Sequence, residues 1–551
     1  MAQVPLDFRD LPKPPPDLRA SDFLIGLALS GGGYRAAAFH LGTLAYLHRV
    51  GMLHQLSRLS TVSGGTFTGA SYILSLVEGK AFADFFRGFY GFLCRAQLIT
   101  DGLDGLGKGT VQVPSGEQKL ITAIANVYDR TFLKTSSGKP YTLGQIIDSK
   151  ISVQEVVFNA TEFRNGIAFR FQKSASPQAR IGNGKISIPK EDAKLIRIAD
   201  IVAASSCFPG GFEPLAFPGD FVWPNNKVPD TVQTAVEKRL PGDKTIAIMD
   251  GGIYDNQGIS SLLLSDDRKK SEPLGMFIIS DVDVPNDNLF PYPQKTRSSG
   301  KLTLGQLYGL LWLFFIICGL TLVAVGYDLW REIVEGTFSF WQDFFSAFMP
   351  VVLVGLVIAT LVVGRRLIRD HLLKNIPQVG VGAWKRLRKL KIDDFIYIMR
   401  LRIESLLALT RSVFMDRIKA LIFQQVYEDK RYQGKRISNR IDRLIDRPLK
   451  VPGASSISKA LEKKVRGAVK MPTTLWFDAN PDKKREQMES LVVTGQATIC
   501  FNLMQYIVRR YGEDLDEYPE VHKLWVELQN DWQQLNKYPV SLLDELLKTS
   551  C

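Results

Sequence analysis

The sequence predicts an α/β fold in which a mostly parallel central sheet is covered by helices on both faces. Three observations support this prediction. From residue 23 onward, short apolar segments alternate with segments of helical period. The short segments are almost continuously apolar, as strands buried on both faces are. Three of them end in glycine, serine or aspartate, so we expect the functional groups at the ends of strands.

The expected elements follow one another in a regular order. Strands are expected at DFLIGLALS (22–30), LSRLSTV (56–62), the two halves of VQEVVFNATEFRNGIAFRFQ (153–172), TIAIMD (245–250) and GMFIISDVDV (275–284). Asn165–Gly166, between the two halves, is a strong hairpin signal. Helices are expected at YRAAAFHLGTLAYLHRVG (34–51) and TFTGASYILSLVEG (66–79).

The composition restricts the class of partner and the kind of site. The chain has 551 residues, of which 45% are hydrophobic, and a formal net charge of +13. Such a basic balance suggests an anionic partner, either nucleic acid or an acidic membrane surface. The five cysteines are scattered and form no C-x-x-C pair. We therefore expect neither a disulfide scaffold nor a zinc site. No metal or cofactor is expected either, because a carboxylate base and backbone N–H donors can carry out the predicted chemistry.

Two charge-free segments predict a membrane hairpin. They are 307–325 and 344–363, and each is long enough as a helix to cross the ~30 Å hydrocarbon layer. Basic residues precede the first and follow the second, whereas the short connection is mostly acidic. By the positive-inside rule we expect a two-pass integral membrane protein with its α/β domain and its C-terminus in the cytoplasm.

The hairpin divides the chain into four expected parts. Residues 1–22 form a proline-rich lead, 23–290 an α/β domain, 305–364 the transmembrane hairpin and 365–551 a basic, helical C-terminal region. The lysines and arginines of the last part are expected to attract anionic lipid headgroups, and a solvated helix face is the alternative. Nucleic acid is not expected, because the membrane already accounts for the position of the charge. The oligomeric state stays open.

Glycines follow the first strand directly, in LALSGGGYRAAAFHLG (27–42). Backbone N–H groups of Gly31, Gly32 and Gly33 can point outward at the start of a helix, which suits an anion. Phosphate binding is one interpretation, although no Lys-Ser/Thr follows as in a P-loop. An oxyanion hole for acyl transfer is another, and a simple tight turn is the third.

The second and third strand ends carry a serine and an aspartate. Ser63 stands between a strand and a helix in LSTVSGGTFTG (59–69), where Gly64 and Gly65 permit a sharp turn. It is either a nucleophile, with Gly64 adding an oxyanion donor, or the N-cap of the helix. Asp250 ends a buried strand in AIMDGGIYDNQGI (247–259), and burial would make its carboxylate a better base. An ordinary Asp-Gly turn is the alternative.

Histidines are too few and too poorly placed for a triad of the usual order. After Asp250 only His371 and His522 remain, and neither lies in a glycine-rich loop. His40 follows the glycines on a helix, where a structural role is expected. A dyad in which Asp250 takes the proton of Ser63 directly therefore fits better.

These segments resemble the patatin-like phospholipases. SGGGYRAAAFHLGTLAYL resembles the oxyanion segment of that family, STVSGGTFTGA its nucleophile elbow and DGGIYDN its Asp-Gly-Gly motif. VVFNATEFRNGIAFRF and IADIVAASSCFPGGFEPL agree with it too, so the resemblance covers about residues 23–284. Ala36 and Thr61 stand where the family often has glycine.

The resemblance implies a three-layer patatin-like fold and a role for each site residue. Ser63 would be the nucleophile and Asp250 the base, with Gly251 and Gly252 completing the aspartate motif. Gly31, Gly32, Gly33 and Gly64 would form the oxyanion hole. Arg35 would position that loop or an anionic headgroup. The resemblance says nothing about the hairpin or the C-terminal region.

The function expected from these features is that of a membrane-anchored serine lipid acyl hydrolase. It would release fatty acids from membrane phospholipids through an acyl-enzyme. An acyltransferase using the same dyad, and a catalytically silent membrane adaptor that binds lipid, are the alternatives. Addition of acceptor alcohols distinguishes an acyltransferase from a hydrolase. Failure of an active-site serine probe to label the protein would favour the adaptor.

Overall fold

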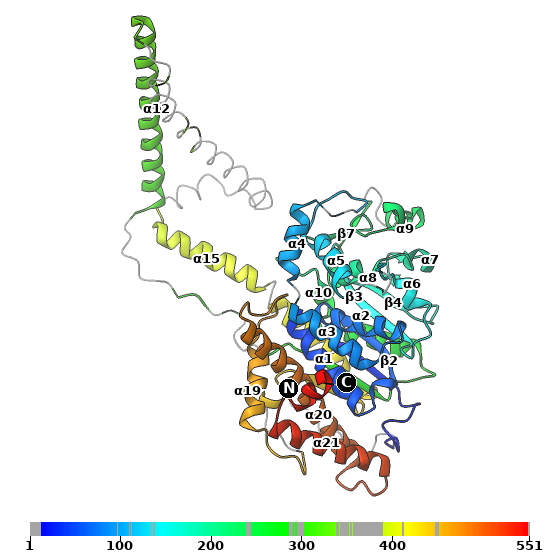
Figure 1. The fold of residues 1–551 in the computed structure, drawn as a ribbon. Helices are drawn as coiled ribbons and strands as arrows, with labels where there is room; N and C mark the ends of the chain where they lie inside the picture. The colour runs from blue at the N-terminus through cyan, green and yellow to red at the C-terminus, as the bar shows by residue number, and fades with distance from the viewer. Residues whose placement is uncertain are drawn as a thin grey trace. The chain divides into compact units, whose positions relative to one another are not determined.

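The computed structural model describes most of the chain and divides it into two compact units. It describes residues 13–285 (except 96, 110, 112, 134, 136–137 and 239–243), 290, 292–294, 302–337, 341, 352, 355, 357, 389–409 and 413–548 (except 447–450). One unit comprises Met1–Asp287 and Phe414–Cys551, and the other comprises Asn288–Val413. Figure 1 labels the elements of both units, which are described separately below.

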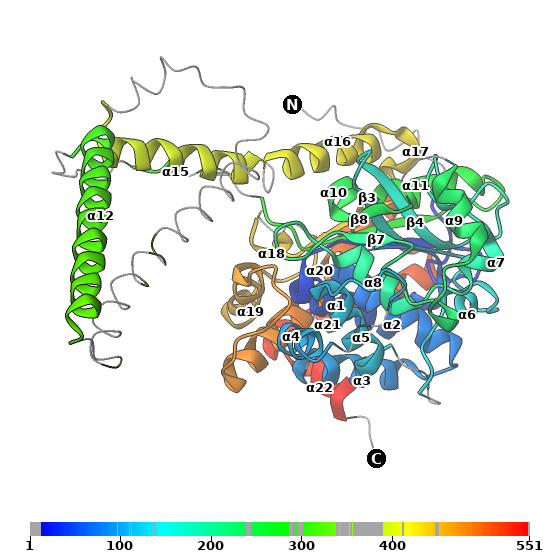
Figure 2. The same ribbon diagram turned by 90° about the horizontal axis from the view of Figure 1, so that it is seen from above.

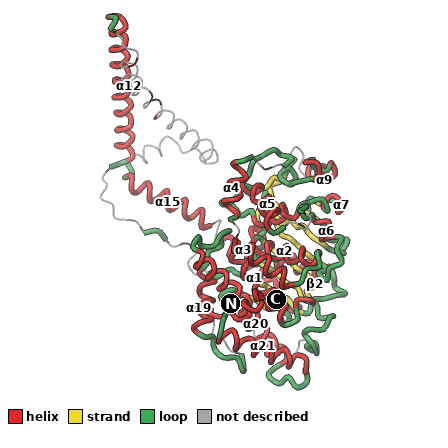
Figure 3. Tube along the Cα trace, viewed as in Figure 1, coloured by secondary structure: helices red, strands yellow, loops and turns green. Residues whose placement is uncertain are grey.

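The first unit is built around one mixed sheet. Its order is β10-β9-β1-β2-β3-β4-β5-β6, with β8 paired to β3 and β7 paired to β8. The strands are β1 (Ile25–Leu29), β2 (Leu56–Val62), β3 (Glu155–Glu162), β4 (Ile167–Lys173), β5 (Ile181–Gly182), β6 (Ser187–Ile188), β7 (Leu215–Phe217), β8 (Ile246–Asp250), β9 (Met276–Asp281) and β10 (Arg436–Arg440). Figure 3 shows these strands in yellow among the red helices.

The pairing is parallel in one half of the sheet and antiparallel in the other. From β10 to β3 the neighbouring strands are parallel. Beyond β3 they are antiparallel, beginning with the β3–β4 hairpin around Asn165–Gly166. Short connections without helices join β3 to β4, β4 to β5 and β5 to β6, and such connections produce antiparallel pairs, whereas helices precede β7 and β8. The expected strands all form. The expected parallel pairing is found from β10 to β3, and the rest of the sheet is antiparallel.

Helices of the first unit surround this sheet. They are α1 (Gly33–Arg49), α2 (Gly64–Val77), α3 (Phe82–Arg95), α4 (Leu98–Gly107), α5 (Leu120–Thr131), α6 (Leu143–Ile147), α7 (Lys190–Ala193), α8 (Ile198–Ser206), α9 (Asp230–Glu237), α10 (Gly252–Asp255), α11 (Ile259–Arg268), α16 (Phe414–Glu428), α17 (Lys430–Gln433), α18 (Arg443–Asp446), α19 (Lys459–Lys470), α20 (Pro481–Tyr511), α21 (Pro519–Lys537) and α22 (Ser541–Lys548).

Alternation along the central strands separates two apolar layers. Leu27 and Leu29 of β1 join the large core on the side of α1, α2 and α20. Ala28 of β1, with Phe277 and Ile279 of β9, packs instead with residues of α11 and α16. Successive side chains of a strand point to opposite faces, so the sheet is covered on both. Figure 2 shows the resulting three layers of this unit, with α11 and α16 on one side and α1, α2 and α20 on the other.

The C-terminal region contributes both a strand and a core helix to the first unit. It supplies β10, which pairs in parallel with β9, and it supplies α20, which lies against α1. The two helices approach closely at two glycines: a Cβ added to Gly42 would lie 2.1 Å from the Val492 carbonyl oxygen, and one added to Gly495 would lie 2.1 Å from that of Phe39. The catalytic unit thus needs residues from both ends of the chain.

Two described helices have the length and apolarity of a membrane span, and they differ in burial. In α20 89% of the most apolar window is buried inside the first unit, so α20 is a core helix. In α12 (Leu304–Glu335), in the second unit, none of that window is buried. Its 32 residues would extend about 48 Å, which exceeds the ~30 Å hydrocarbon layer. The first expected span, 307–325, lies inside α12.

The second unit also holds α15 (Ile392–Ala408), whose start is paired with the start of α12. Thr303 and Lys391 form an antiparallel bridge, and the Ile392 amide donates to the Leu302 carbonyl at 3.0 Å. The second expected span, 344–363, lies outside the described residues apart from single positions.

Candidate active site

The ends of two strands meet on one edge of β3. β2 runs parallel to β3, and its last pair is Val62 with Asn159. β8 runs antiparallel to β3, and its last pair is Asp250 with Ala160. The two strands therefore approach each other head to head, because β4 occupies the other edge of β3. This arrangement places Ser63, the residue after Val62, beside Asp250.

Ser63 has the backbone conformation of a sharp, strained turn. Its φ is 49° and its ψ is −120°, values that non-glycine residues rarely adopt. Its amide donates to Ser205 Oγ at 3.0 Å, which helps to hold the turn. α2 begins at the next residue, yet the Ser63 side chain makes no capping hydrogen bond. The hydroxyl is therefore not used as a helix cap.

Glycines after Ser63 allow this turn to press against the end of β1. A Cβ added to Gly64 would lie 2.1 Å from the Gly33 carbonyl oxygen, and one added to Gly65 would lie 2.4 Å from that of Leu29. Both contacts are with backbone atoms, which cannot move aside as a flexible side chain can. The close approach of the two strand ends therefore requires glycine at both positions.

Thr61 fits in the elbow without disturbing it. Its side chain is fully buried, and its Oγ1 lies 2.9 Å from Thr66 Oγ1, which in turn lies 2.8 Å from Ser205 Oγ. Its methyl group occupies the space beside Gly69, where an added Cβ would lie 2.4 Å from Thr61 Cγ2. Two residues before Ser63, where the resemblance leads us to expect glycine, the chain thus has a threonine that packs against Gly69 of α2.

The Asp250 carboxylate is buried and held at the end of β8. Its Oδ1 accepts from the Gly252 amide at 2.7 Å, and its carbonyl accepts from Thr161 Oγ1 at 2.8 Å. Burial raises the pKa of Asp250 to about 6, while hydrogen bonds from the Ser63 side chain and the Gly252 amide act in the opposite direction. The carboxylate is therefore a stronger base than an exposed aspartate.

This pKa predicts the pH dependence of the reaction. We expect Asp250 to act as the base in its ionised form, so kcat/KM for a soluble short-chain ester should fall about tenfold per pH unit below pH 6 and level off above it. A soluble ester avoids any contribution from the ionisation of lipid headgroups. A profile that stays flat from pH 5 to pH 8 would contradict the assignment of Asp250 as the base.

The glycine loop lies directly beside Ser63. A Cβ added to Gly31 would lie 3.1 Å from Ser63 Cβ, and Gly32 and Gly33 have φ of 139° and 58°. The Gly31 amide already donates to the Asn256 carbonyl at 2.9 Å. Within the described part of the chain, the amides of Gly32, Gly33 and Gly64 have no such partner. Three of the four expected oxyanion donors are thus available, and Gly31 has a structural hydrogen bond instead.

A segment from the C-terminal region covers the other side of this loop. The Tyr34 amide donates to the Thr474 carbonyl at 2.8 Å, and Arg35 Nη1 donates to the Met471 carbonyl at 2.9 Å. A Cβ added to Gly33 would lie 2.3 Å from that Thr474 oxygen. Burial lowers the pKa of Arg35, and the nearby Asp283 and Asp281 oppose this shift. Of the two roles expected for Arg35, its contacts match the positioning of the loop.

Arg35→Lys tests this positioning role. We expect kcat to fall about tenfold with little change in KM, because a lysine ammonium cannot reproduce the planar guanidinium contact. The Tyr34 amide should also exchange its hydrogen faster, since its acceptor at Thr474 loosens. Arg49→Lys, at the other end of α1 where Arg49 pairs with Asp531, is the matched control. If KM rises while kcat and the exchange rate stay unchanged, Arg35 contacts the lipid headgroup instead.

Three further residues connect the parts of the site and were not expected from the sequence. Asn159 Nδ2 donates to the Thr61 carbonyl at 2.9 Å, and the Asn159 carbonyl accepts from Ser205 Oγ at 2.7 Å. The Asn256 side chain lies between the glycine loop and the aspartate motif, near both Gly31 and Gly252. All three stand in segments that the resemblance already included, but only their contacts indicate a role.

His40 takes no part in this arrangement. Its Nδ1 lies 2.9 Å from Ser280 Oγ and its Nε2 lies 3.0 Å from the Ser30 carbonyl, so it connects α1 with β1 and β9. Burial lowers its pKa to about 4. Among the described residues, no group of three or more histidine, cysteine or acidic side chains could hold a metal ion.

A strained serine, a buried aspartate and free backbone donors at adjoining strand ends are typical of serine acyl hydrolases. Comparison with protein families gives the particular class. Residues 27–263 match the family model described as patatin-like phospholipase. This part of the chain is therefore a patatin-like phospholipase domain with the patatin fold.

The individual proteins that match this chain have low sequence identity to it. Phospholipase B of Cryptococcus neoformans var. neoformans is 26% identical over 198 residues, which cover 35% of this chain and 29% of the yeast protein. The chain thus matches less than a third of that relative. Among solved structures, human GIVD cytosolic phospholipase A2 in complex with methyl gamma-linolenyl fluorophosphonate matches with a TM-score of 0.27 and 13% identity over 47% of this chain and 40% of that one. VipD from Legionella pneumophila matches with a TM-score of 0.23 and 11% identity, over 96% of this chain and 93% of VipD.

Proposed function

We propose that the protein is a membrane-anchored serine hydrolase that releases fatty acids from phospholipids. The observation that carries this proposal is the meeting of β2 and β8 on β3, which sets a strained Ser63 beside the buried Asp250. The patatin-like phospholipase model over residues 27–263 supports the lipid substrate class.

The chemistry follows from these groups. Ser63 Oγ attacks the acyl carbonyl carbon, and its proton passes to Asp250. The amides of Gly32, Gly33 and Gly64 stabilise the charge that develops on the carbonyl oxygen. The intermediate then collapses, and the leaving alkoxide takes the proton from Asp250. A water molecule, deprotonated by the same aspartate, attacks the acyl-enzyme and releases the fatty acid.

The membrane anchor is the second part of the proposal. α12 is apolar and long enough to cross a bilayer, and none of its residues is buried. An exposed apolar helix of this length is unfavourable in water, so we assign it to the bilayer as the first span of the hairpin. Anchoring would keep the active site beside its substrate.

A serine-reactive fluorophosphonate tests the proposal on the full chain in detergent. We expect the probe to modify Ser63, as located by peptide mass spectrometry, and to stop fatty-acid release from phospholipid micelles in proportion to labelling. Release that continues after complete labelling, or labelling at another serine, would contradict the assignment. Added acceptor alcohols should leave free fatty acid as the main product, whereas an acyltransferase would form new esters.

A further inference from the structure

One face of α19 presents a continuous row of cations. Lys459, Lys463, Arg466 and Lys470, here called the cationic stripe, are all exposed. Their spacing of four, three and four residues places them on one side of a helix. Leu461, Val465 and Ala468 have the same spacing on the opposite side and are buried. The helix is thus fixed by its apolar side and turns its cations outward.

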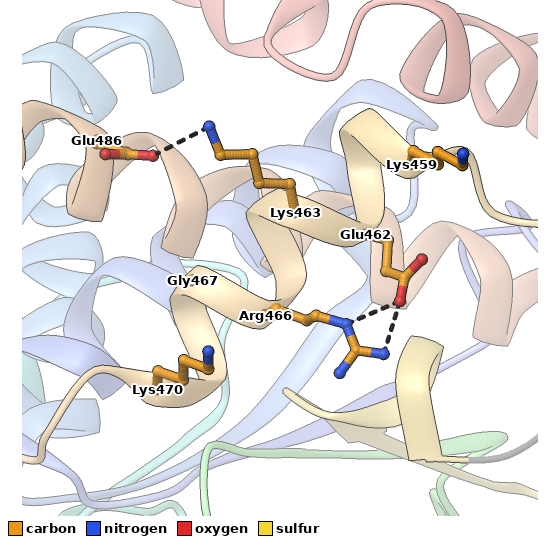
Figure 4. A pocket seen from close by; sticks show the side chains of 7 residues that line it. All are labelled: Lys459, Glu462, Lys463, Arg466, Gly467, Lys470 and Glu486. Carbon is orange, nitrogen blue, oxygen red and sulfur yellow. Dashed lines mark hydrogen bonds and ion pairs between the residues drawn. The ribbon is translucent and has the colours of Figure 1, made fainter.

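The cationic stripe lines a shallow groove of about 420 Å³ between α19 and the start of α20. Glu462 and Glu486 lie in the same groove and pair with Arg466 at 2.6 Å and Lys463 at 3.9 Å. Figure 4 shows these pairs, with Lys459 and Lys470 outside them. Within the described residues these two lysines have no ion-pair partner, so four cations and two carboxylates leave the groove positive.

The helix that carries the cationic stripe leads into the segment that contacts the glycine loop. α19 ends at Lys470, and the next residue, Met471, accepts the hydrogen bond from Arg35. Three residues further, Thr474 accepts from the Tyr34 amide beside the oxyanion glycines. The cationic stripe therefore ends one residue before this segment and extends along the helix for about 16 Å, at 1.5 Å per residue.

An exposed tryptophan lies on the same connection. Trp476 is 56% exposed, although its neighbours Leu475 and Phe477 are buried. Thr474 Oγ1 donates to the Trp476 carbonyl at 2.8 Å and so holds this turn. An exposed indole beside basic side chains is typical of a surface that lies at the level of lipid headgroups.

We propose that the cationic stripe and Trp476 form a docking surface for anionic phospholipid headgroups at the entrance of the active site. This inference rests on the proposed function, because it requires that the site faces a bilayer. The surface aligns the oxyanion loop with the membrane plane, so that an acyl ester can reach Ser63 while neighbouring headgroups occupy the stripe. Nucleic acid would satisfy the charge, and single strands also stack on exposed aromatic rings, but nucleic acid would not account for the position beside a lipid site.

Protection of lysines from chemical modification tests the surface without any need for hydrolysis. Full-length Ser63→Ala protein is placed in nanodiscs of phosphatidylcholine alone or mixed with phosphatidylserine, so α12 is inserted in both. An amine-reactive reagent is added, and modification is read by mass spectrometry. We expect Lys459 and Lys470 to react about tenfold more slowly in the anionic discs. Lys523 and Lys537, exposed on α21, should react equally in both.

Equal reactivity of Lys459 and Lys470 in the two kinds of disc would overturn the proposal. Equal protection in neutral discs by a DNA duplex at physiological salt would overturn the lipid assignment. Protection that requires phosphatidylserine supports the proposal even if no fatty acid is released, so its failure and that of the proposed function can be told apart.

Charge reversal gives a second, catalytic readout. In mixed micelles the wild-type rate is expected to rise with the fraction of phosphatidylserine, and Lys459→Glu with Lys470→Glu should reduce this activation about tenfold. Lys523→Glu with Lys537→Glu makes the same change of charge on α21 and should retain the activation. If both double variants lose the activation equally, the effect is one of total charge and the docking surface is refuted.

Discussion

Replacement of Ser63 by alanine is expected to lower the rate of fatty-acid release at least about 10⁴-fold, because the attacking oxygen is removed. Asp250→Asn should produce a similar loss, since an amide cannot accept the proton. The measurement is release of labelled fatty acid from phospholipid vesicles by the purified full-length protein. Ser75→Ala, on the helix that follows the Ser63 turn, is the matched control: the Ser75 hydroxyl donates to the Tyr72 carbonyl within that helix, so activity should be retained.

The two dyad variants should remain folded, and one should become more stable. In the folded protein the pKa of Asp250 is about 6, above the value of 3.8 for an exposed aspartate. Its folded state therefore binds the proton more tightly, and the resulting stability is lost as pH rises through 6. At pH 8 the buried charge of Asp250 lowers the free energy of unfolding by up to about 3 kcal/mol. Asp250→Asn removes this charge, so the free energy of unfolding should rise by a similar amount. Full activity in either variant would refute the dyad.

Replacement of Gly42 by leucine is expected to lower the free energy of unfolding by more than about 3 kcal/mol. The first added carbon would lie 2.1 Å from the carbonyl oxygen of Val492 and 2.9 Å from its carbonyl carbon. These are backbone atoms of a buried helix, so α1 and α20 would have to separate. Because α1 begins at the glycine loop, activity should fall with stability. Denaturant unfolding of the purified protein measures the change.

Gly88→Ala is the control for this substitution. Gly88 is exposed within α3, and an added Cβ would meet nothing within 4 Å. Alanine is the better helix former, so stability should rise by about 0.5–1 kcal/mol. If Gly42→Leu is tolerated as well as Gly88→Ala, the close contact between α1 and α20 is absent in solution.

Much of the α/β domain could be predicted from local pattern. The strands ending at Leu29, Val62 and Asp250 form where short apolar runs meet glycine or aspartate, and the Asn165–Gly166 hairpin forms where expected. These features depend on burial and turn geometry within a few residues, which sequence expresses directly. The same local patterns left two possible roles for Ser63, a nucleophile or a helix cap.

Local pattern could not show which distant segments complete the unit. Apolar composition says that a helix avoids water, but it does not say what covers it. α12 and α20 both pass the test for a membrane span, yet one is exposed and the other is buried against α1. β10 joins the sheet from a region whose helical period is much stronger than this one short strand.

The candidate site shows the same division. The sequence by itself determined that a serine, an aspartate and three glycines end three strands, because the requirements of a tight turn act between neighbours. Only the tertiary structure decided that Ser63 and Asp250 adjoin, that the Gly31 amide is already bonded and that Arg35 holds Met471. Each of these depends on strand pairing or on contact between residues far apart in the chain, and such contacts arise from packing of the whole unit rather than from local preference.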